Sequence, residues 1–513
     1  MAQMQDFIRG NRVLARWAGG LSYQTLRSAA AQPESDLHLT THEYAPALAP
    51  RPQRFGLRLG ERKLMVALAD WLVIIGGLAA IALSSERAYE PFTVLVTLTL
   101  VTAFWFFFSS AFDAYSVLVL QSPFRSIYNT VQASLVTGVV YTLLALFTGG
   151  VLPVVRFRLS ELMLMLLVVV PLALVRGGWA LFLSHAPLRR HVAVVGANRS
   201  GAEMLVALTR YGGTSYKFLG FFDDHPAPDF GAREAEPAPV YPATDLLAIN
   251  DLVGIGQIIV ANPVQNESLL RTLSICHERG IQITPMFALY QDLTGRVPVG
   301  HVGQDWYVAL PAHVKSTTRT YMFIKRGYDI LFALLGLIFA APLIPLIALA
   351  IKLDSPGPIF FRQTRTGLGG KLFKITKFRS MYQDAEALLG AVWAERGDPR
   401  ITRVGRLLRR SRLDEIPQLW NVLVGDMSFV GPRPERPEFE ERLDREIPFY
   451  RARRAVRPGL TGWAQVRQGY GNTLLDTLRK VEYDLYYIKN ESLYLDLLIL
   501  IRTIGVVIGL RGT

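Results

Sequence analysis

The sequence predicts a multidomain membrane protein with four transmembrane helices, a parallel α/β domain, a re-entrant membrane hairpin and a mainly α-helical cytoplasmic domain. Three observations predict this organisation. Half of the 513 residues are hydrophobic, and many lie in apolar runs of about 20 residues, the length that crosses a bilayer. A short apolar strand followed by a glycine-containing turn indicates an α/β unit. A later apolar segment has two prolines near its middle and basic residues at both ends.

Composition restricts the partners and the chemistry. The net charge of +13 predicts anionic partners, which are lipid headgroups, nucleotides or nucleic acid. A single cysteine, Cys276, excludes an intrachain disulfide and catalysis by a cysteine pair. Residues 1–62 are polar and predict a flexible cytoplasmic tail. His38 and His42 in this tail have i, i+4 spacing but no helical context, so a metal site is not expected there.

Residues 63–186 predict four transmembrane helices. Basic residues precede the first segment and follow the fourth, which favours a cytoplasmic location for both flanks. Pro171 and Arg176 interrupt the fourth segment, and Arg156 and Arg158 in the third loop oppose this topology. The apolar segments are Leu64–Leu83, Phe92–Phe112, Ile127–Phe147 and Leu162–Leu183.

Residues 187–312 predict a cytoplasmic α/β domain. Val192–Val195 is typical of a buried strand, and a glycine-containing turn and a helix follow it. The acidic pair Asp223-Asp224 comes about 20 residues later, as in a Rossmann fingerprint whose middle glycine is replaced by Asn198. Because that glycine lets the backbone approach a pyrophosphate, its loss disfavours dinucleotide binding. A Rossmann-like domain that has kept the fold and lost the ligand is the alternative.

Residues 322–352 predict a re-entrant membrane helix. Its apolar part, Tyr328–Ile351, would reach about 36 Å as a straight helix, which is enough to span. Pro342 and Pro345 each remove a backbone donor and favour a break. Basic residues flank both ends, so the positive-inside tendency places both ends in the cytoplasm. An ordinary fifth span is the alternative, and it would move the rest of the chain to the other side.

The candidate chemistry lies after this hairpin. Asp414 and Glu415 directly follow a run with seven arginines between residues 396 and 412. Arginine forks suit phosphate, so a carboxylate pair among them indicates phosphoryl chemistry with a nucleophile or metal ligand. The alternative is a solvated basic helix with an ordinary salt bridge. Pro-Gly and Pro-Arg-Pro turns preset backbone angles and could direct Arg433 and Arg457 toward a phosphate.

From about Lys325 to its C-terminus the chain resembles the bacterial monotopic phosphoglycosyltransferases, the polyprenyl-phosphate hexose-1-phosphate transferases. The hairpin with its central proline and the motifs KFRSM, LDE, GDMSFVGPRP and RPGLTGWAQ carry the resemblance. The four spans and the Rossmann-like domain resemble the long form of this family, which starts exopolysaccharide or capsule assembly. Ala341 departs from the family, because some members have serine just before the proline.

The resemblance implies that residues 353–513 form a catalytic domain that transfers hexose-1-phosphate, with glucose as the expected sugar, from a UDP-sugar to undecaprenyl phosphate. Asp414 matches the nucleophile, which would form an aspartyl-phosphosugar and release UMP. Glu415 matches the partner acid, and the two carboxylates are expected to hold Mg²⁺. The expected phosphate-binding residues are Arg409, Arg433, Arg457, Lys377 and Arg379.

The expected location is the bacterial inner membrane, with the catalytic domain in the cytoplasm where the UDP-sugar is found. The expected partners are the UDP-sugar, undecaprenyl phosphate and the bilayer, and a homodimer is one option for assembly. Leu493–Leu510, interrupted by Asp496 and Arg502, predicts an interfacial amphipathic helix. No nucleic-acid motif is present, so nucleic acid is not an expected partner.

Two other functions compete with this one. A membrane-anchored nucleotide-sugar dehydratase or epimerase would need an intact dinucleotide loop and a Tyr-x-x-x-Lys pair. The clear match, Tyr321 with Lys325, lies at the mouth of the membrane hairpin and is interpreted as coincidence. A non-enzymatic membrane scaffold would leave Asp414 and Glu415 unexplained.

Overall fold

The structure is a computed structural model. It describes residues 59–84, 90–148, 159–183, 189–213, 215–226, 238–261, 266–299, 319–383, 398–468, 471 and 473–508. His38, His42, Arg156 and Arg158 lie outside these residues.

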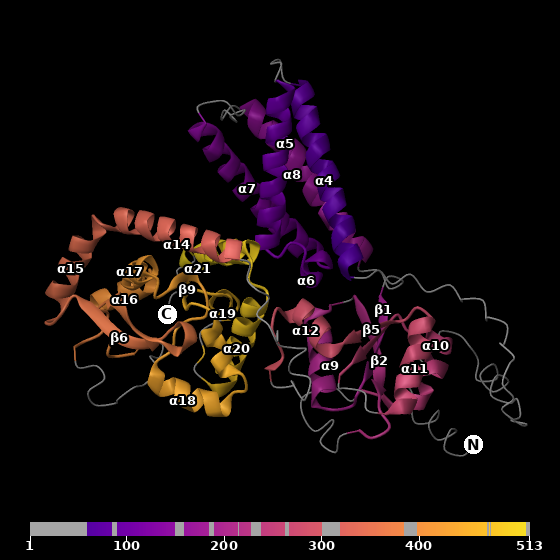
Figure 1. The fold of residues 1–513 in the computed structure, drawn as a ribbon. Coiled ribbons are helices and arrows are strands. Elements are labelled where there is room, and N and C mark those ends of the chain that lie inside the picture. The colour runs from indigo at the N-terminus through magenta and orange to yellow at the C-terminus, as the bar shows by residue number, and fades with distance from the viewer. Residues whose placement is uncertain are drawn as a thin grey trace, which may run out of the picture. The chain divides into compact units, whose positions relative to one another are not determined.

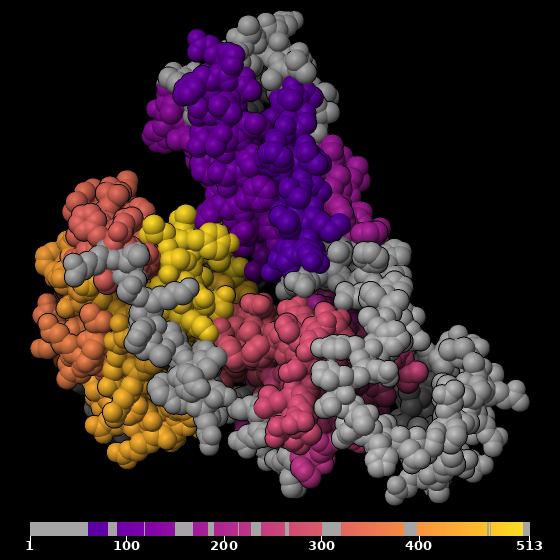
Figure 2. All heavy atoms as spheres, turned by 45° about the vertical axis from the view of Figure 1, so that its right-hand side comes forward, coloured from indigo at the N-terminus to yellow at the C-terminus, as the bar shows by residue number. Residues whose placement is uncertain are grey.

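The four N-terminal apolar segments form helices (Figure 1). By length and composition three of them can cross a membrane, over Gly60–Ala80, Pro91–Ala111 and Pro123–Phe147, and Val168–Phe182 in the fourth is a shorter apolar helix. Helices α4 and α7 pack against α8, and α5 packs against α7. The atoms of these helices are indigo to purple in Figure 2 and form a continuous mass. The elements are α4 (Leu59–Ser84), α5 (Pro91–Ala111), the short α6 (Val117–Leu120), α7 (Pro123–Phe147) and α8 (Leu159–Leu183).

Arg176, which interrupts the fourth apolar segment, is fully buried against Asp70 of α4. Its Nε and Nη2 atoms donate to the two carboxylate oxygens of Asp70 at 2.9 and 2.6 Å. The hydroxyl of Tyr115 donates to the same carboxylate, and Nη1 of Arg176 donates to the carbonyl of Ala114. A buried charge is tolerated when it is paired and hydrogen-bonded in this way, so Arg176 does not prevent α8 from packing with the other helices.

The α/β domain contains a five-stranded parallel sheet with the strand order β3-β2-β1-β4-β5. Helices α9 and α12 cover one face of the sheet, and α10 and α11 cover the other, each over its own apolar core (Figure 1). The predicted strand at Val192–Val195 is confirmed within β1. The elements are β1 (Arg190–Val195), α9 (Arg199–Tyr211), β2 (Tyr216–Phe222), β3 (Val240–Tyr241), α10 (Leu246–Val253), β4 (Gln257–Val260), α11 (Glu267–Glu278), β5 (Gln282–Pro285) and α12 (Met286–Thr294).

The predicted membrane hairpin is a bent pair of helices, α14 (Arg319–Ala340) and α15 (Leu343–Asp354). The two apolar helices meet at an angle of 61°. The break lies at Ala341-Pro342, and Pro342 is the N-cap residue of α15. Pro345 is compatible with the break, because in an unbroken helix its ring would clash with the carbonyl of Ala341. It lies in the first turn of α15, where backbone N–H groups have no helical acceptor and proline therefore costs little.

The C-terminal domain is an α/β domain, so the prediction of a mainly α-helical domain missed its strands. Strands β6 (Phe360–Thr366) and β7 (Leu372–Phe378) form an antiparallel hairpin. Strands β8 (Ser428–Val430) and β9 (Gly459–Thr461) form a short parallel pair. The helical elements are α16 (Arg403–Arg410), η5 (Leu413–Glu415), α17 (Gln418–Val424), α18 (Pro437–Glu446), η6 (Tyr450–Ala455), α19 (Trp463–Arg467), α20 (Leu474–Lys489) and α21 (Leu493–Ile508).

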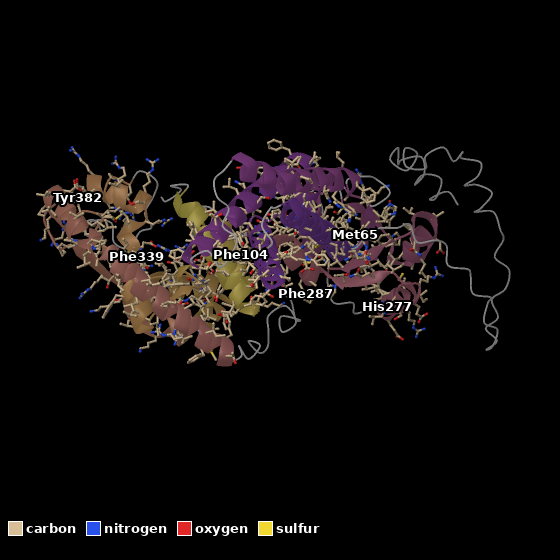
Figure 3. The ribbon with its side chains drawn as sticks, turned by 90° about the horizontal axis from the view of Figure 1, so that it is seen from above. Met65, Phe104, His277, Phe287, Phe339 and Tyr382 are labelled. Atoms are coloured by element: carbon tan, nitrogen blue, oxygen red, sulfur yellow. The ribbon has the colours of Figure 1, made fainter. Side chains whose placement is uncertain are left out.

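Both arms of the bent pair pack on this domain. Ala333 of α14 belongs to a core with Phe373, Val422 and Met427. Ile347 and Ile351 of α15 belong to another core, with Phe378 and Leu408. The other side of each arm exposes large apolar side chains, among them Phe339, which is labelled in Figure 3.

Helix α21 covers the segment predicted to be interfacial, but Asp496 is not on a polar outer face. Its side chain is almost fully buried. It accepts hydrogen bonds from Tyr321, Tyr328 and Lys325 of α14, and from Tyr487 of α20. Asp496, the charge that interrupts this apolar segment, therefore makes its hydrogen bonds inside the domain.

Candidate active site

Asp414 and Glu415 lie in the single 3₁₀ turn η5, between the arginine-rich helix α16 and helix α17. Arg412, directly before this turn, has φ of 61°, in the left-handed region that non-glycine residues rarely adopt. Such strained backbone concentrates at functional sites. Both carboxyl-bearing residues are buried, at 6% and 8% exposure. Burial of two neighbouring acids is costly unless nearby cations compensate their negative charge.

Glu415 is held by cations from three different segments. Nη2 of Arg433 lies 2.7 Å from its Oε1 atom, and Nζ of Lys377 lies 3.1 Å from the same oxygen. Nη1 of Arg412 is 3.8 Å away. Burial alone would raise the pKa of Glu415, but Arg433 and Lys377 outweigh burial and hold that pKa well below its usual range. Glu415 is therefore an ionised anchor for the surrounding cations.

Asp414 has a different environment. Among the residues that the structure describes, its Oδ1 atom is buried and has no hydrogen-bond partner. Burial raises the pKa of Asp414, and the neighbouring charge of Glu415 raises it further, while Lys377, Arg409 and Arg412 partly oppose the increase. An oxygen without a partner, surrounded by cations, fits a nucleophile that attacks an anionic phosphorus centre.

Backbone contacts explain how Lys377 and Arg433 reach the same carboxylate. Asn421 of α17 accepts from the backbone N–H of Thr376 and donates to the carbonyl of Lys374, so it ties α17 to β7 next to Lys377. The loop with Arg433 leaves β8, which pairs with β9. The first residue of β9, Gly459, must be glycine, because a Cβ at this position would lie 2.2 Å from the backbone nitrogen of Gly431.

The other predicted phosphate-binding residues lie in different surroundings. Arg409 on α16 is close enough to influence the pKa of Asp414. Arg457 is exposed just before β9. Arg379 has a structural position: it donates to the carbonyls of Ser355 and Pro356 at 2.7 and 2.6 Å, just after α15 ends. Those contacts use both terminal nitrogens, whereas Nε has no partner among the described residues, so phosphate binding by Arg379 stays a prediction.

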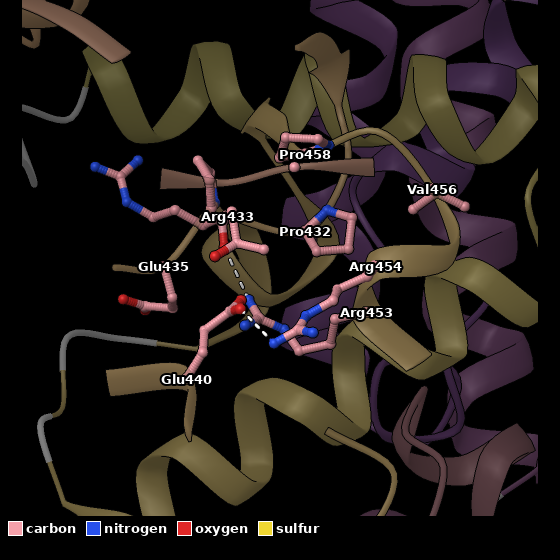
Figure 4. A pocket seen from close by; sticks show the side chains of 11 residues that line it. Pro432, Arg433, Glu435, Glu440, Arg453, Arg454, Val456 and Pro458 are labelled. Atoms are coloured by element: carbon pink, nitrogen blue, oxygen red, sulfur yellow. Dashed lines mark hydrogen bonds and ion pairs between the residues drawn. The ribbon is translucent and has the colours of Figure 1, made fainter. Parts of the chain in front are cut away.

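A small hollow lies beside the Arg433 loop (Figure 4). Nη2 of Arg453 donates to the carbonyl of Arg433 at 2.8 Å, and Nη2 of Arg454 pairs with Glu440 at 2.6 Å. Thr366 also lines the hollow, and its buried Oγ1 atom has no partner among the described residues. The hollow is therefore polar on one side and lined by prolines on the other. Its lining residues are Thr366, Gly367, Pro432, Arg433, Pro434, Glu435, Glu440, Arg453, Arg454, Val456 and Pro458.

The donor set allows a divalent cation only with help from a substrate. The described residues contain no group of three or more His, Cys, Asp or Glu side chains that could hold a metal ion. Mg²⁺ often binds one or two carboxylates together with substrate phosphates. The unpartnered Oδ1 of Asp414 fits this role, whereas Oε1 of Glu415 is already shared by Arg433 and Lys377.

The residues proposed for a dehydratase or epimerase are engaged elsewhere. Tyr321 and Lys325 both contact Asp496, which explains their spacing as a structural contact. In the α/β domain, the side chain of Asn198 accepts from the backbone N–H of Gly201 at the start of α9. Asp223 accepts from the N–H of Ala197 at 2.7 Å. Side chains of the protein thus occupy backbone donors that a pyrophosphate would need in a dinucleotide-binding turn.

Comparison with known proteins agrees with this site. The sequence profile of the family described as bacterial sugar transferase matches residues 320–509, which include the bent helix pair, the acid pair and the Arg433 loop. A UDP-glucose:undecaprenyl-phosphate glucose-1-phosphate transferase from Caulobacter vibrioides is 50% identical over 182 residues, 35% of this chain and 68% of the relative. The chain belongs to the bacterial sugar transferase family. Its matched region contains Asp414, Glu415, Arg433 and Lys377.

The names of two further relatives specify different sugars. A UDP-N-acetylgalactosamine-undecaprenyl-phosphate N-acetylgalactosaminephosphotransferase from Aeromonas hydrophila is 47% identical over 239 residues, 46% of this chain and 55% of the relative. An undecaprenyl-phosphate glucose phosphotransferase from Komagataeibacter xylinus is 46% identical over 188 residues, 36% of this chain and 35% of the relative. The match thus spans about half or less of the length of these two relatives.

The sequence reasoning missed several residues around the site. Asp329 was counted within an apolar segment, although an ionisable residue in such a segment is itself a functional signal. The contacts that Arg326 and Asn421 make with distant backbone have no signature in the sequence. The left-handed backbone at Arg412 also has none, because arginine is not a residue type that favours it.

Proposed function

We propose that this protein transfers hexose-1-phosphate from a UDP-sugar to undecaprenyl phosphate, giving undecaprenyl-diphosphate-sugar and UMP. The single observation that carries the proposal is the environment of Asp414. This buried carboxylate keeps an oxygen without a partner, and Glu415 beside it is anchored by Lys377 and Arg433. The relatives named for undecaprenyl-phosphate sugar transfer support the substrate class.

In the proposed first step, an oxygen of Asp414 attacks the sugar-bearing phosphorus of the UDP-sugar. The bond between that phosphorus and the bridging oxygen breaks, and UMP leaves with the electron pair. In the second step, a phosphate oxygen of undecaprenyl phosphate attacks the same phosphorus and the Asp414 carboxylate is released. In this proposal Arg409 and Arg433 stabilise charge on the phosphate oxygens. Both steps use one site in turn, as covalent catalysis allows.

Mg²⁺ fits this site if Asp414 and the donor diphosphate share it. When bound, it would supply Lewis-acid stabilisation of phosphate charge. Chelation with EDTA is therefore expected to lower UMP release, and added Mg²⁺ is expected to restore it. Activity that is unaffected by chelation would remove the metal from the proposal.

The packing of the bent helix pair supports the proposed location. Both α14 and α15 pack on the same catalytic domain, which supports a hairpin that enters and leaves one leaflet. A straight span would separate α15 from Phe378 and Leu408. We therefore propose a bacterial inner-membrane protein whose catalytic domain meets the acceptor phosphate at the cytoplasmic headgroup level. Initiation of exopolysaccharide or capsule synthesis would follow from this reaction.

The test is UMP release by the purified protein from UDP-glucose, UDP-galactose and UDP-N-acetylgalactosamine, with and without undecaprenyl phosphate. Sustained UMP production that depends on the lipid is expected, with UDP-glucose as the preferred donor. UDP release would indicate direct glycosyl transfer instead. Asp414→Asn, which keeps the shape of the side chain, is the matched control and should release no UMP.

A further inference from the structure

Helix α14 has two sides with opposite chemistry. The side that faces the catalytic domain is defined here as the inner face of α14 and consists of Arg326, Asp329, Ala333 and Gly336. Their spacing of three and four residues places them on one helix face. Ala333 is fully buried, and a Cβ at Gly336 would lie 2.9 Å from Cδ1 of Leu419 in α17. The other side exposes large apolar residues such as Phe323, Leu331, Leu334, Ile338 and Phe339.

Arg326 of the inner face holds the C-terminal end of α17. Its Nη1 and Nη2 atoms donate to the carbonyls of Val422 and Leu423 at 2.7 and 2.6 Å. These carbonyls belong to the last turn of the helix, where a cation is favourable, and the carbonyl of Val422 also accepts from the backbone N–H of Gly425 at 3.1 Å. Gly425 ends the helix with φ of 95°, and a Cβ there would lie 3.4 Å from Nη2 of Arg326. Glycine thus provides the turn, because other residues rarely adopt this backbone conformation.

Asp329 of the inner face holds the start of β8. Its Oδ1 atom accepts from the hydroxyl of Ser428 at 3.0 Å and from the backbone N–H of Phe429 at 2.9 Å. Asp329 is 1% exposed and Ser428 is fully buried. A buried carboxylate is expensive, so its retention in an apolar segment calls for a function.

The two held segments lead directly to the two sides of the site. Helix α17 begins three residues after Glu415, and β8 ends three residues before Arg433. Between them the chain only turns, through Gly425, Asp426 and Met427. The inner face of α14 therefore supports the whole unit that brings Arg433 to Glu415.

We propose that Arg326 and Asp329 are positioning residues that set Arg433 against the Asp414–Glu415 pair, so that the membrane helix is part of the active-site frame. This inference rests on the proposed function. Among the described residues, no hydrogen bond or ion pair joins either of them to Glu415 or Asp414, so both act through α17 and β8. A misplacement of about 1 Å at a reacting centre can cost about a hundredfold in rate, which gives such a frame a measurable effect.

The chain offers a matched control on the same helix. Tyr321 and Lys325 also tie α14 to the domain through Asp496 of α21. Among the described residues neither is hydrogen-bonded directly to α17 or β8; Lys325 reaches β8 only through Tyr487, which donates to the carbonyl of Val430 at 3.3 Å. Tyr321 is therefore the cleaner control. If the role of α14 were only to attach the domain to the membrane, loosening either set of contacts would have the same effect. If the inner face positions Arg433, only changes at Arg326 and Asp329 will affect turnover strongly.

The experiment compares Asp329→Ala, Asp329→Asn, Arg326→Ala and Tyr321→Phe in the full-length protein. The first readout is hydrogen exchange at the backbone amides of residues 425–433, which needs no activity. Faster exchange is expected in Asp329→Ala, where the Phe429 amide loses its acceptor, and unchanged exchange is expected in Tyr321→Phe. Asp329→Asn keeps an acceptor oxygen and should lie between Asp329→Ala and the unmodified protein.

The second readout is the kinetics of UMP release. Asp329→Ala and Arg326→Ala should lower kcat by about tenfold or more, with the donor KM changed by less than about threefold. Tyr321→Phe should stay within about twofold of the unmodified protein. In an Arg433→Lys background, Asp329→Ala should have little further effect, because the residue it positions has already been changed.

Equal losses in Tyr321→Phe and Asp329→Ala would overturn the inference, as would unchanged amide exchange in Asp329→Ala. If Asp329→Ala does not accumulate, Ser428→Ala removes one of the same two hydrogen bonds and should shift exchange and kcat in the same direction. No effect of Ser428→Ala on either would also overturn it. If the unmodified protein released no UMP, the proposed function would fail, whereas the exchange comparison would still test the positioning.

Discussion

Nη2 of Arg433 lies 2.7 Å from Oε1 of Glu415, although the two residues belong to the loop after β8 and the turn before α17. Lys377 from β7 shares the same oxygen. Glu415 thus joins three segments and partly offsets the positive charge of Lys377 and Arg433 beside Asp414. The two acids therefore have different roles. Glu415 anchors the surrounding cations, whereas Asp414 keeps an oxygen without a partner among the described residues.

Arg433→Ala should therefore weaken catalysis more than stability. The substitution removes a cation that can stabilise phosphate charge, and loss of one such donor costs about 10²-fold or more in kcat. Arg433→Lys keeps the charge but not the fork, so it should recover part of the rate. Single-turnover UMP release measures this difference. Activity of Arg433→Ala near that of the unmodified protein would remove Arg433 from the site.

Glu415→Gln should move the acid limb of the pH profile. Burial raises the pKa of Asp414, and the charge of Glu415 raises it further. The proposed nucleophile is the carboxylate, so the rate falls as the pH falls through this pKa. Removing the Glu415 charge lowers the pKa of Asp414, and the acid limb should shift to lower pH even though the maximal rate decreases. An unmoved limb, or one shifted to higher pH, would contradict the assignment.

Substitutions of Arg379 and Arg457 should have different effects, the first on stability and the second on binding of the donor. Arg379→Ala leaves the carbonyls that follow α15 without their donor, and we expect a loss of about 2 kcal/mol of stability. The measurement is the midpoint of thermal unfolding in detergent. Arg457 is exposed, so Arg457→Ala should leave that midpoint unchanged, and any effect should appear as a higher donor KM. The reverse pattern would show that the two roles had been exchanged.

Pro342 and Pro345 should differ in their effect on the membrane hairpin. Pro342 lies at the break, whereas Pro345 lies in the first turn of α15. Pro342→Leu is expected to favour a straighter helix and to change the accessibility of the C-terminus to a membrane-impermeant label. Pro345→Leu leaves Pro342 at the break and should change it less. Equal effects of the two substitutions would contradict the position of the break.

Much of this fold could be predicted from local patterns. Apolar length located the helices α4, α5 and α7, and the central proline located the break of the hairpin. The strand at Val192–Val195 and its glycine-containing turn indicated the α/β domain. These signals are local, because helix periodicity, apolar runs and turn residues each depend on a few neighbouring residues.

The parts that were missed depend on contacts between distant segments. Arg379 was placed among the phosphate ligands, and no sequence pattern indicated that its two terminal nitrogens also reach the carbonyls just after α15. Sequence reasoning treated Asp329 as part of an apolar run, although its contact with Ser428 and Phe429 spans about 100 residues of chain. Asp496 contributed to the prediction that Leu493–Leu510 is an interfacial amphipathic helix. In the structure it is buried against partners from α14 and α20. No local pattern specifies such pairs.

The central claim is that Asp414 becomes covalently attached to the phosphosugar. The most direct measurement incubates the protein, without undecaprenyl phosphate, with the sugar-labelled form of whichever UDP-sugar yields UMP, and then maps the label after denaturation and proteolysis. The account predicts label on the peptide that contains Asp414, its release by added undecaprenyl phosphate before denaturation, and no label in Asp414→Asn. Label on another residue, or UMP formation only when the acceptor is present and without labelled protein, would contradict it.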